Sequence, residues 1–233
     1  MVFTKRICPP ERQKAVLGIS IAPSFRTLSI SNNDSPLEDF HILITLRIIY
    51  SKQPSKAITI RTNNSVFAPS GPADEYDTLS KGTVALSSSP DRHINLGRFI
   101  SHTARPSSPP SRDLKERPGT HLLTIPAQGE FVVKHAVPLA RIFKFEERLK
   151  PEDLVDEVWK FQLRDGFVGT SWWCWGDLEG ELKEKRLSAW HEGLRAEIMP
   201  KPDVDNEAWV FGCNPIELIF EDRTEDSSFR FVA

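Results

Sequence analysis

The feature that most constrains the fold is a strict alternation along residues 40 to 49. Phe40 and every second residue up to Ile48 are apolar, whereas the intervening positions mix apolar side chains with polar ones such as Thr45 and Arg47. Successive side chains of a β-strand point to opposite faces, so a period of two predicts a strand with one fully buried face. Such a strand requires a sheet and a second layer to cover it.

Turn-forming residues are frequent throughout the chain. Its 233 residues include 18 prolines and 12 glycines but only two methionines, a composition typical of many short elements joined by turns. We expect roughly eight to ten strands, and an all-β, Greek-key (immunoglobulin-like) antiparallel β-sandwich with long loops and one or two short helices. Strand-like patterns beyond the first lie at 57–62, 83–86, 94–100, 121–125, 130–137, 157–164, 167–175, 187–191, 208–211 and 216–221.

Three turn signals predict hairpins, and the turn-rich residues 87–92 indicate one between 83–86 and 94–100. Another joins the strand at 40–49 to the strand at 57–62 across a short polar break. The third is Asp165-Gly166, which separates 157–164 from 167–175, and Asp-Gly between two strand-like runs is a strong hairpin signal.

The chain divides into three parts by composition. Residues 1–36 are predicted to be a loosely ordered lead-in, 37–221 a single β-sandwich domain, and 222–233 a frayed tail. Within the domain, the Pro/Ser/Arg-rich stretch 103–119 is predicted to be a surface loop, either a solvated insertion or a basic docking loop. The segment 178–186 is predicted to be a short surface helix, because opposite charges recur four residues apart.

Charge and cysteine content restrict the partners and the compartment. Thirty basic and 32 acidic residues are interspersed, so no strong field exists to attract nucleic acid or a membrane surface. No run approaches the roughly 20 apolar residues that span a bilayer. Three cysteines are too few for a disulfide scaffold and favour a reducing, cytoplasmic location. Pairing of Cys174 with Cys213 stays open as an alternative.

The run from Trp172 to Asp177 is the best candidate for a site. If it is a strand, Trp172 and Cys174 face one way while Trp173 and Trp175 face the other. One pair belongs to a core, and the other is either covered or exposed. Exposed indoles beside a carboxylate would suit a sugar ring or an aromatic metabolite, so Trp173, Trp175 and Asp177 are the candidate ligand-binding residues. Structural packing is the alternative.

Motifs for catalysis or metal binding are not found in the sequence. The six histidines have no spacing that places two of them on one metal ion. Residues 169–173 lack the second glycine of a nucleophile elbow, and no glycine-rich phosphate loop occurs. We therefore predict no catalytic residues, no metal and no cofactor.

Several segments resemble a group of uncharacterised filamentous-fungal (ascomycete) hypothetical proteins. The resemblance rests on residues 42–49, 57–60 and 119–126, and above all on 169–183 with its Trp-Trp-Cys-Trp-Gly-Asp-Leu-Glu-Gly motif, and it covers most of 37–221. It implies a cytosolic β-sandwich of immunoglobulin-like shape. It implies no assigned reaction and no binding residues.

Three functional hypotheses follow. The first is a non-enzymatic intracellular interaction or ligand-binding module, whose partner is an unknown protein, a small-molecule or sugar ligand, or a second copy forming a homodimer. The alternative is a small cofactor-free enzyme or accessory protein in fungal (secondary) metabolism, with a tryptophan-walled pocket in which Asp177, Glu179 or His191 moves a proton. A secreted carbohydrate-binding module is the third, and it requires glycosylation of the sequons at Asn33 and Asn63.

Overall fold

The computed structural model describes residues 8–30, 40–68, 82–88, 92–94, 96, 111–137, 150–188 and 208–233. Within these ranges the chain is mostly β-strand, joined by turns and short 3-10 helices, so the β-rich class predicted from the sequence is confirmed. The strands are β1 (Ala15–Pro23), β2 (Thr27–Ser29), β3 (His41–Ser51), β4 (Ile58–Arg61), β5 (Thr83–Ser87), β6 (His93–Ile94), β7 (Leu122–Ile125), β8 (Phe131–Ala136), β9 (Val158–Leu163), β10 (Trp173–Trp175), β11 (Arg186–Ser188), β12 (Trp209–Phe211), β13 (Leu218–Asp222) and β14 (Ser228–Val232), and the 3-10 helices are Pro10–Arg12, Leu114–Glu116, Pro151–Asp153, Asp165–Phe167 and Pro215–Glu217.

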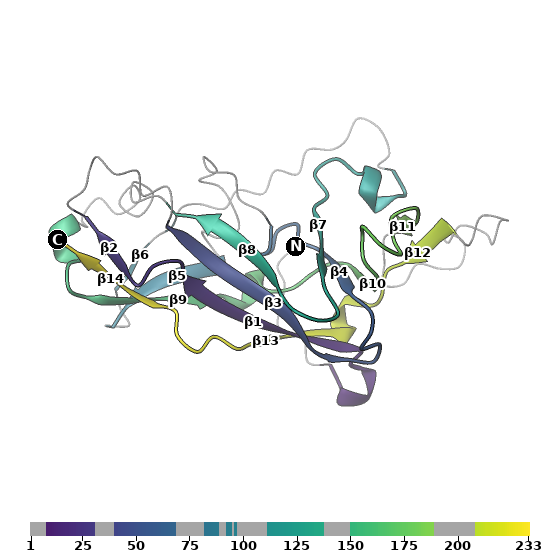
Figure 1. Cartoon of the computed structure of the whole chain (residues 1–233), viewed down its shortest axis with the longest axis horizontal. Coiled ribbons are helices and arrows are strands. Elements are labelled where there is room, and N and C mark those ends of the chain that lie inside the picture. The colour runs from purple at the N-terminus through teal and green to yellow at the C-terminus, as the bar shows by residue number, and fades with distance from the viewer. Residues whose placement is uncertain are drawn as a thin grey trace.

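The described strands form four sheets with mixed strand directions. Their orders are β13-β1-β3-β8, β2-β14-β9-β5-β6, β10-β4-β7 and β11-β12. In Figure 1, β2, β6 and β14 lie at one end of the molecule and β4, β7 and β10 at the other, with β1 and β3 running between them. The pairs β1–β13, β11–β12 and β14–β2 are parallel, so the prediction of purely antiparallel sheets is wrong. Parallel neighbours need long crossovers, and here they join strands far apart in the sequence.

The supposed lead-in contains the central strand of the four-stranded sheet. β1 pairs with β13 on one side and with β3 on the other, and its side chains at Ala15, Leu17, Ile19 and Ile21 are at most 2% exposed. A strand with neighbours on both edges has its backbone groups paired and its apolar face covered. The prediction of a loosely ordered segment is therefore wrong for residues 15–23; residues 1–7 and 31–39 lie outside the described part.

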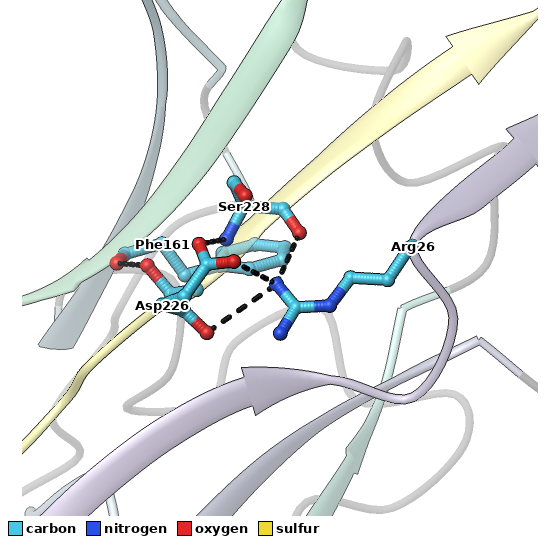
Figure 2. A network of polar contacts seen from close by, with 5 residues as sticks. Arg26, Phe161, Asp226 and Ser228 are labelled. Carbon is cyan, nitrogen blue, oxygen red and sulfur yellow. Dashed lines mark hydrogen bonds and ion pairs between the residues drawn. The ribbon is translucent and has the colours of Figure 1, made fainter.

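The C-terminal tail is also part of a sheet. β14 pairs with β9 and β2, and it buries Phe229 and Phe231 at 2% and 0% exposure. Figure 2 shows the polar tie that holds its start: Nη1 of Arg26 donates to Oδ2 of Asp226 at 2.8 Å and to the carbonyl of Ser228 at 2.9 Å. The prediction of a frayed tail is wrong for Ser228–Val232, because alternate phenylalanines anchor this strand in the core.

One hydrophobic core unites the two larger sheets. Phe40, next to β3, lies 5.5 Å from Phe229 of β14 and 6.2 Å from Phe161 of β9 between ring centroids, and those two rings stack at 4.9 Å. Aromatic contacts at these separations add to the large area that each ring buries. The core includes residues from Ala15 to Phe231, so it extends beyond the predicted domain limits of 37–221 at both ends.

A second, smaller cluster packs beside the three-stranded sheet. It includes Leu114, Trp172 and Leu187, each at most 2% exposed. The side chain of Asp113, 7% exposed, accepts from the backbone N–H groups of Lys115 and Leu187. The described part of the predicted 103–119 loop, residues 111–119, therefore contributes to a core, which contradicts a freely solvated insertion; residues 103–110 lie outside the described part.

Two of the three predicted hairpins are wrong, whereas the hairpin of 83–86 with 94–100 is confirmed in its described part by the antiparallel pairing of β5 with β6. β3 pairs with β1 and β8, whereas β4 pairs with β10 and β7. Asp165–Phe167 is a 3-10 turn that leads from β9, in the five-stranded sheet, to β10, in another sheet. Local turn chemistry indicates where a strand ends, but the partner is set by which sheet buries its apolar face.

The predicted surface helix is replaced by turns. The backbone N–H of Gly180 donates to the carbonyl of Asp177, and that of Lys183 to Gly180, before β11 begins. These bonds span three residues and do not continue as an α-helical ladder.

Candidate functional site

The tryptophan run is buried on both of its faces. β10 pairs with β4, with Trp173 opposite Ile60 and Trp175 opposite Ile58. Trp173 is 0% exposed, and Trp172 and Cys174 on the other side are 2% and 1% exposed. Each face of the run therefore meets a separate hydrophobic cluster, and the run joins the main core to the smaller one.

Trp173 is held as a core residue. Its Nε1 donates to the carbonyl of Asn214 at 2.9 Å, and its ring meets that of Trp175 edge to face, 5.2 Å between centroids. A fully enclosed indole with a satisfied N–H presents nothing to a ligand in solution. The expectation that Trp173 forms a contact surface is wrong, and Trp175 is partly buried against the same core.

The neighbouring Trp172 is fixed by close backbone packing. Its Nε1 donates to the carbonyl of Ser188 at 2.8 Å. A Cβ on Gly212 would lie 2.2 Å from that nitrogen, so only glycine allows the chain to approach the indole this closely. Trp172 therefore ties β10 to the β11–β12 pair.

Asp177 organises a turn. Its Oδ1 accepts from the backbone N–H of Glu179 at 3.0 Å, and its carbonyl accepts from Leu182 at 2.9 Å. Its own N–H donates to the carboxylate of Glu181 at 2.9 Å, which is the main cause of the lowered pKa of Glu181. The preceding Gly176 has φ +118°, a conformation that favours glycine. The candidate carboxylate thus shapes the chain after β10.

The cysteines of this region are free thiols. Cys213 lies opposite Trp173 in a β-bridge, so its side chain is on the Trp173 face, whereas Cys174 packs in the smaller cluster on the other face. Burial raises the pKa of both thiols, which suppresses the reactive thiolate. The alternative pairing of Cys174 with Cys213 is not formed.

Other titratable groups give no reactive arrangement in the described ranges. No three histidine, cysteine or carboxylate side chains gather there in a way that could hold a metal ion. His135 is 0% exposed, and its Nε2 lies 2.7 Å from the carbonyl of Val66, as in a satisfied core histidine. His191, a candidate proton carrier, lies outside the described residues.

A surface that sequence reasoning missed lies on the outer face of the four-stranded sheet. Val16 pairs with Tyr50 and Leu17 with Ile48, so Ile49 is an extra residue in β3. Such a β-bulge places two successive side chains on one face. Ile49 and Tyr50 are 37% and 49% exposed.

These side chains form an apolar patch across three strands. Ile219, Val16 and Tyr50 lie in one row in register, and a Cβ on Gly18 would lie 2.9 Å from Cγ2 of Ile49. We call Val16, Gly18, Ile49, Tyr50 and Ile219 the outer patch. Ile49 and Tyr50 are its exposed members and Ile219 is half-buried, whereas Val16 and Gly18 are buried. Exposed apolar side chains that lie together on a sheet mark a site of interaction more often than a scattered apolar residue does.

The rim of the outer patch is basic. Arg47 and Arg223 approach the position of a Gly18 Cβ to 3.7 and 3.4 Å, and both side chains are exposed. Arg223 forms an ion pair with Glu221, whereas Arg47 has no ion pair among the described residues. The signal that could have found this patch is the run Ile48-Ile49-Tyr50, where the alternation of the strand breaks.

Comparisons with protein-family models, with curated proteins and with solved structures found no match. Helices long and apolar enough to cross a membrane do not occur in the described part of the chain.

Proposed function

We propose that this chain is a non-enzymatic interaction module that binds a partner protein through the outer patch. The observation that carries the proposal is the bulge in β3, which presents Ile49 and Tyr50 together on an exposed sheet face. Tyrosine is among the residues that contribute most to binding energy at interfaces. Burying the exposed half of Tyr50 in an interface would contribute roughly 2 kcal/mol to the binding free energy, from the apolar area removed from water.

The proposal also includes the fold type and the cellular location of the protein. We infer an immunoglobulin-like, Greek-key sandwich of the fungal group that the sequence resembles, working in the cytoplasm. Support comes from the shared core between the four-stranded and five-stranded sheets and from the three unpaired cysteines. A rigid core beneath β1 and β3 would hold the outer patch in one shape, which lowers the entropy lost on binding.

The basic rim selects the kind of partner. Arg47 and Arg223 flank the patch, so the proposed partner presents an apolar side chain with carboxylates beside it. Arg223 is paired with Glu221, so Arg47 carries the remaining charge of the rim among the described residues, and a second copy bound face to face would bring a like charge against it. The partner is therefore a different protein.

The proposal includes no reaction and no sugar. The alternative enzyme requires tryptophans that wall a pocket, and sugar stacking requires an exposed ring face. Trp173 is fully enclosed, and no observation on the remaining candidates favours either hypothesis.

The experiment compares two single variants in affinity purification from cell extract. Tyr50→Ser removes the aromatic ring of the outer patch, and Phe25→Ser removes an equally exposed ring, 50% against 49%, in the turn before β2. Melting temperatures are measured for both, because surface substitutions of this kind change stability by only about 0.5 kcal/mol.

The proposal predicts a partner that wild type and Phe25→Ser retain and that Tyr50→Ser loses, with retention weakening as salt rises. Equal retention by all three proteins, or self-association of wild type that Tyr50→Ser abolishes, contradicts it.

A further inference from the structure

Two arginines lie at loops that adjoin beside the three-stranded sheet, where Asn63 bonds to both Arg61 and Gly119. Arg61 is the last residue of β4, and Arg117 follows the 3-10 helix Leu114–Glu116. The backbone of Arg61 is fixed, because its N–H donates to the carbonyl of Trp172 at 2.9 Å and its carbonyl accepts from Oγ1 of Thr170 at 2.7 Å. The buried tryptophan run thus determines where this arginine starts.

Each guanidinium is tethered through its Nε. Nε of Arg61 donates to Oδ1 of Asn63 at 3.0 Å, and Nε of Arg117 donates to the carbonyl of Ser111 at 2.6 Å. Among the residues that the structure describes, the terminal nitrogens of both arginines have no hydrogen bond, and neither side chain has an ion pair. Two forks of N–H donors are therefore oriented and not bonded to any group of the described residues.

Asn63 holds the loops around the two arginines together. Its Oδ1 also accepts from the backbone N–H of His121 at 3.0 Å, and its Nδ2 donates to the carbonyl of Gly119. A further backbone bond runs from Thr62 to His121 at 2.9 Å. These bonds fix the loops in the unbound protein, which reduces the conformational entropy that is lost when a ligand binds.

The charges of this pair are not compensated within the described protein. Arg61 is partly buried, and burial, followed by the positive charge of Arg117, lowers its pKa. Like charges that are desolvated together are unfavourable unless an anion lies between or beside them. Surface arginines usually avoid this arrangement by turning toward solvent or toward a carboxylate.

We propose that Arg61 and Arg117 bind the dianionic phosphate group of a phosphorylated small molecule. Arginine forks match phosphate oxygens in pairs of parallel hydrogen bonds. A phosphate monoester carries about −1.5 to −2 charges at pH 7 and offsets both arginines, whereas a single carboxylate offsets only one. The site is independent of the outer patch and of its partner.

One nearby carboxylate opposes the anion and provides a test. Oε2 of Glu116 lies 2.7 Å from Oγ of Ser111, the residue whose carbonyl accepts from Arg117. Its negative charge repels an incoming phosphate, so Glu116→Gln tightens binding by about twofold.

The experiment is calorimetric titration of the intact chain with inorganic phosphate and with phosphoserine, alongside acetate at equal ionic strength. Arg61→Gln and Arg117→Gln each remove one fork. Arg112→Gln is the matched control, because it removes an exposed arginine of the same turn that has no side-chain hydrogen bond or ion pair among the described residues. Melting temperatures are measured for all variants, because Arg117→Gln relieves the repulsion on Arg61 but also removes the hydrogen bond from Nε of Arg117 to Ser111.

The expected result is phosphate binding that weakens about tenfold in each of the two fork variants and is unchanged in Arg112→Gln. Tighter binding of phosphoserine than of inorganic phosphate points to a larger ligand, and the reverse points to free phosphate; both results support the site. Equal phosphate binding by all variants, no binding by wild type, or acetate binding as tight as phosphate overturns the proposal.

Discussion

Replacing Trp173 by phenylalanine should destabilise the protein strongly, although the substitution keeps an aromatic ring. The indole is 0% exposed, and its Nε1 bond to Asn214 would be lost. A lost hydrogen bond of this kind costs about 1 kcal/mol. Removing part of a buried indole and leaving a small cavity costs about 1–2 kcal/mol more. The free energy of unfolding should therefore fall by about 2–3 kcal/mol.

The matched control is Trp175→Phe, two residues along the same strand. Trp175 is only partly buried, and its Nε1 makes no hydrogen bond among the described residues. Its replacement should cost about 0.5–1 kcal/mol. Each variant keeps an aromatic pair of one phenylalanine and one tryptophan. The difference between their losses in unfolding free energy therefore reports the burial and the hydrogen bond of Trp173.

Urea denaturation followed by circular dichroism measures both changes without relying on tryptophan emission. For a chain of this length, 2–3 kcal/mol corresponds to a fall in melting temperature of roughly 5–10 °C. Acrylamide quenching should also reach Trp175 more readily than Trp173. A loss below 1 kcal/mol for Trp173→Phe, or equal losses in the two variants, would refute the assignment of Trp173 to the core.

Three further predictions address other parts of the fold. Gly212→Ala should cost about 1–3 kcal/mol, because its Cβ would lie 2.2 Å from Nε1 of Trp172, and an unchanged urea midpoint would contradict this. Hydrogen bonds from Ser228, followed by the charge of Arg26, lower the pKa of Asp226 below its usual 3.8. The stabilisation that this carboxylate contributes is therefore complete above pH 4 and is lost as the pH falls further. Asp226→Asn should flatten the acid limb of a plot of unfolding free energy against pH, measured from pH 6 to pH 2. Cys174 should resist iodoacetamide at pH 8 in the native protein, because burial raises the pKa of its thiol. It should react in about 8 M urea, which unfolds most domains. Equal labelling in both conditions would be evidence against a buried thiol.

Strands with a clear alternating pattern could be predicted from the sequence. The predicted strand at 40–49 corresponds to β3, and the pattern at 157–164 corresponds to β9. In both, one buried face alternates with a face that is more exposed, which is what a period of two reports. These elements lie where local sequence and burial agree.

The central strand and the last strand were missed for different physical reasons. β1 is buried along most of its length, so it lacks an alternating polar face, and Gly18 and Ser20 weaken its apolar pattern further. β14 is short and follows a polar segment, so its two phenylalanines are not enough to indicate a strand. Both strands are stabilised by partners distant in the chain, which no local pattern reports.

The prediction of a ligand site at the tryptophan run was wrong for a related reason. Alternation correctly placed Trp172 and Trp173 on opposite faces, but it could not say that both faces would be covered. The sheet containing β10 lies between two hydrophobic clusters, and one of them includes Leu114 from the predicted surface loop and Leu182 from the predicted surface helix. The outer patch depends on a bulge, which is a property of strand pairing.

We propose that Tyr50 is the centre of the contact surface, and the tryptophan run belongs to the core. The most direct test is photo-crosslinking in cell extract, with a photoreactive phenylalanine analogue placed at position 50 in one protein and at position 175 in another. We expect a discrete protein adduct from position 50, suppressed when Arg47 and Arg223 are both changed to glutamate, and no such adduct from position 175. An adduct from position 175 alone would contradict the account and return the site to the tryptophan run.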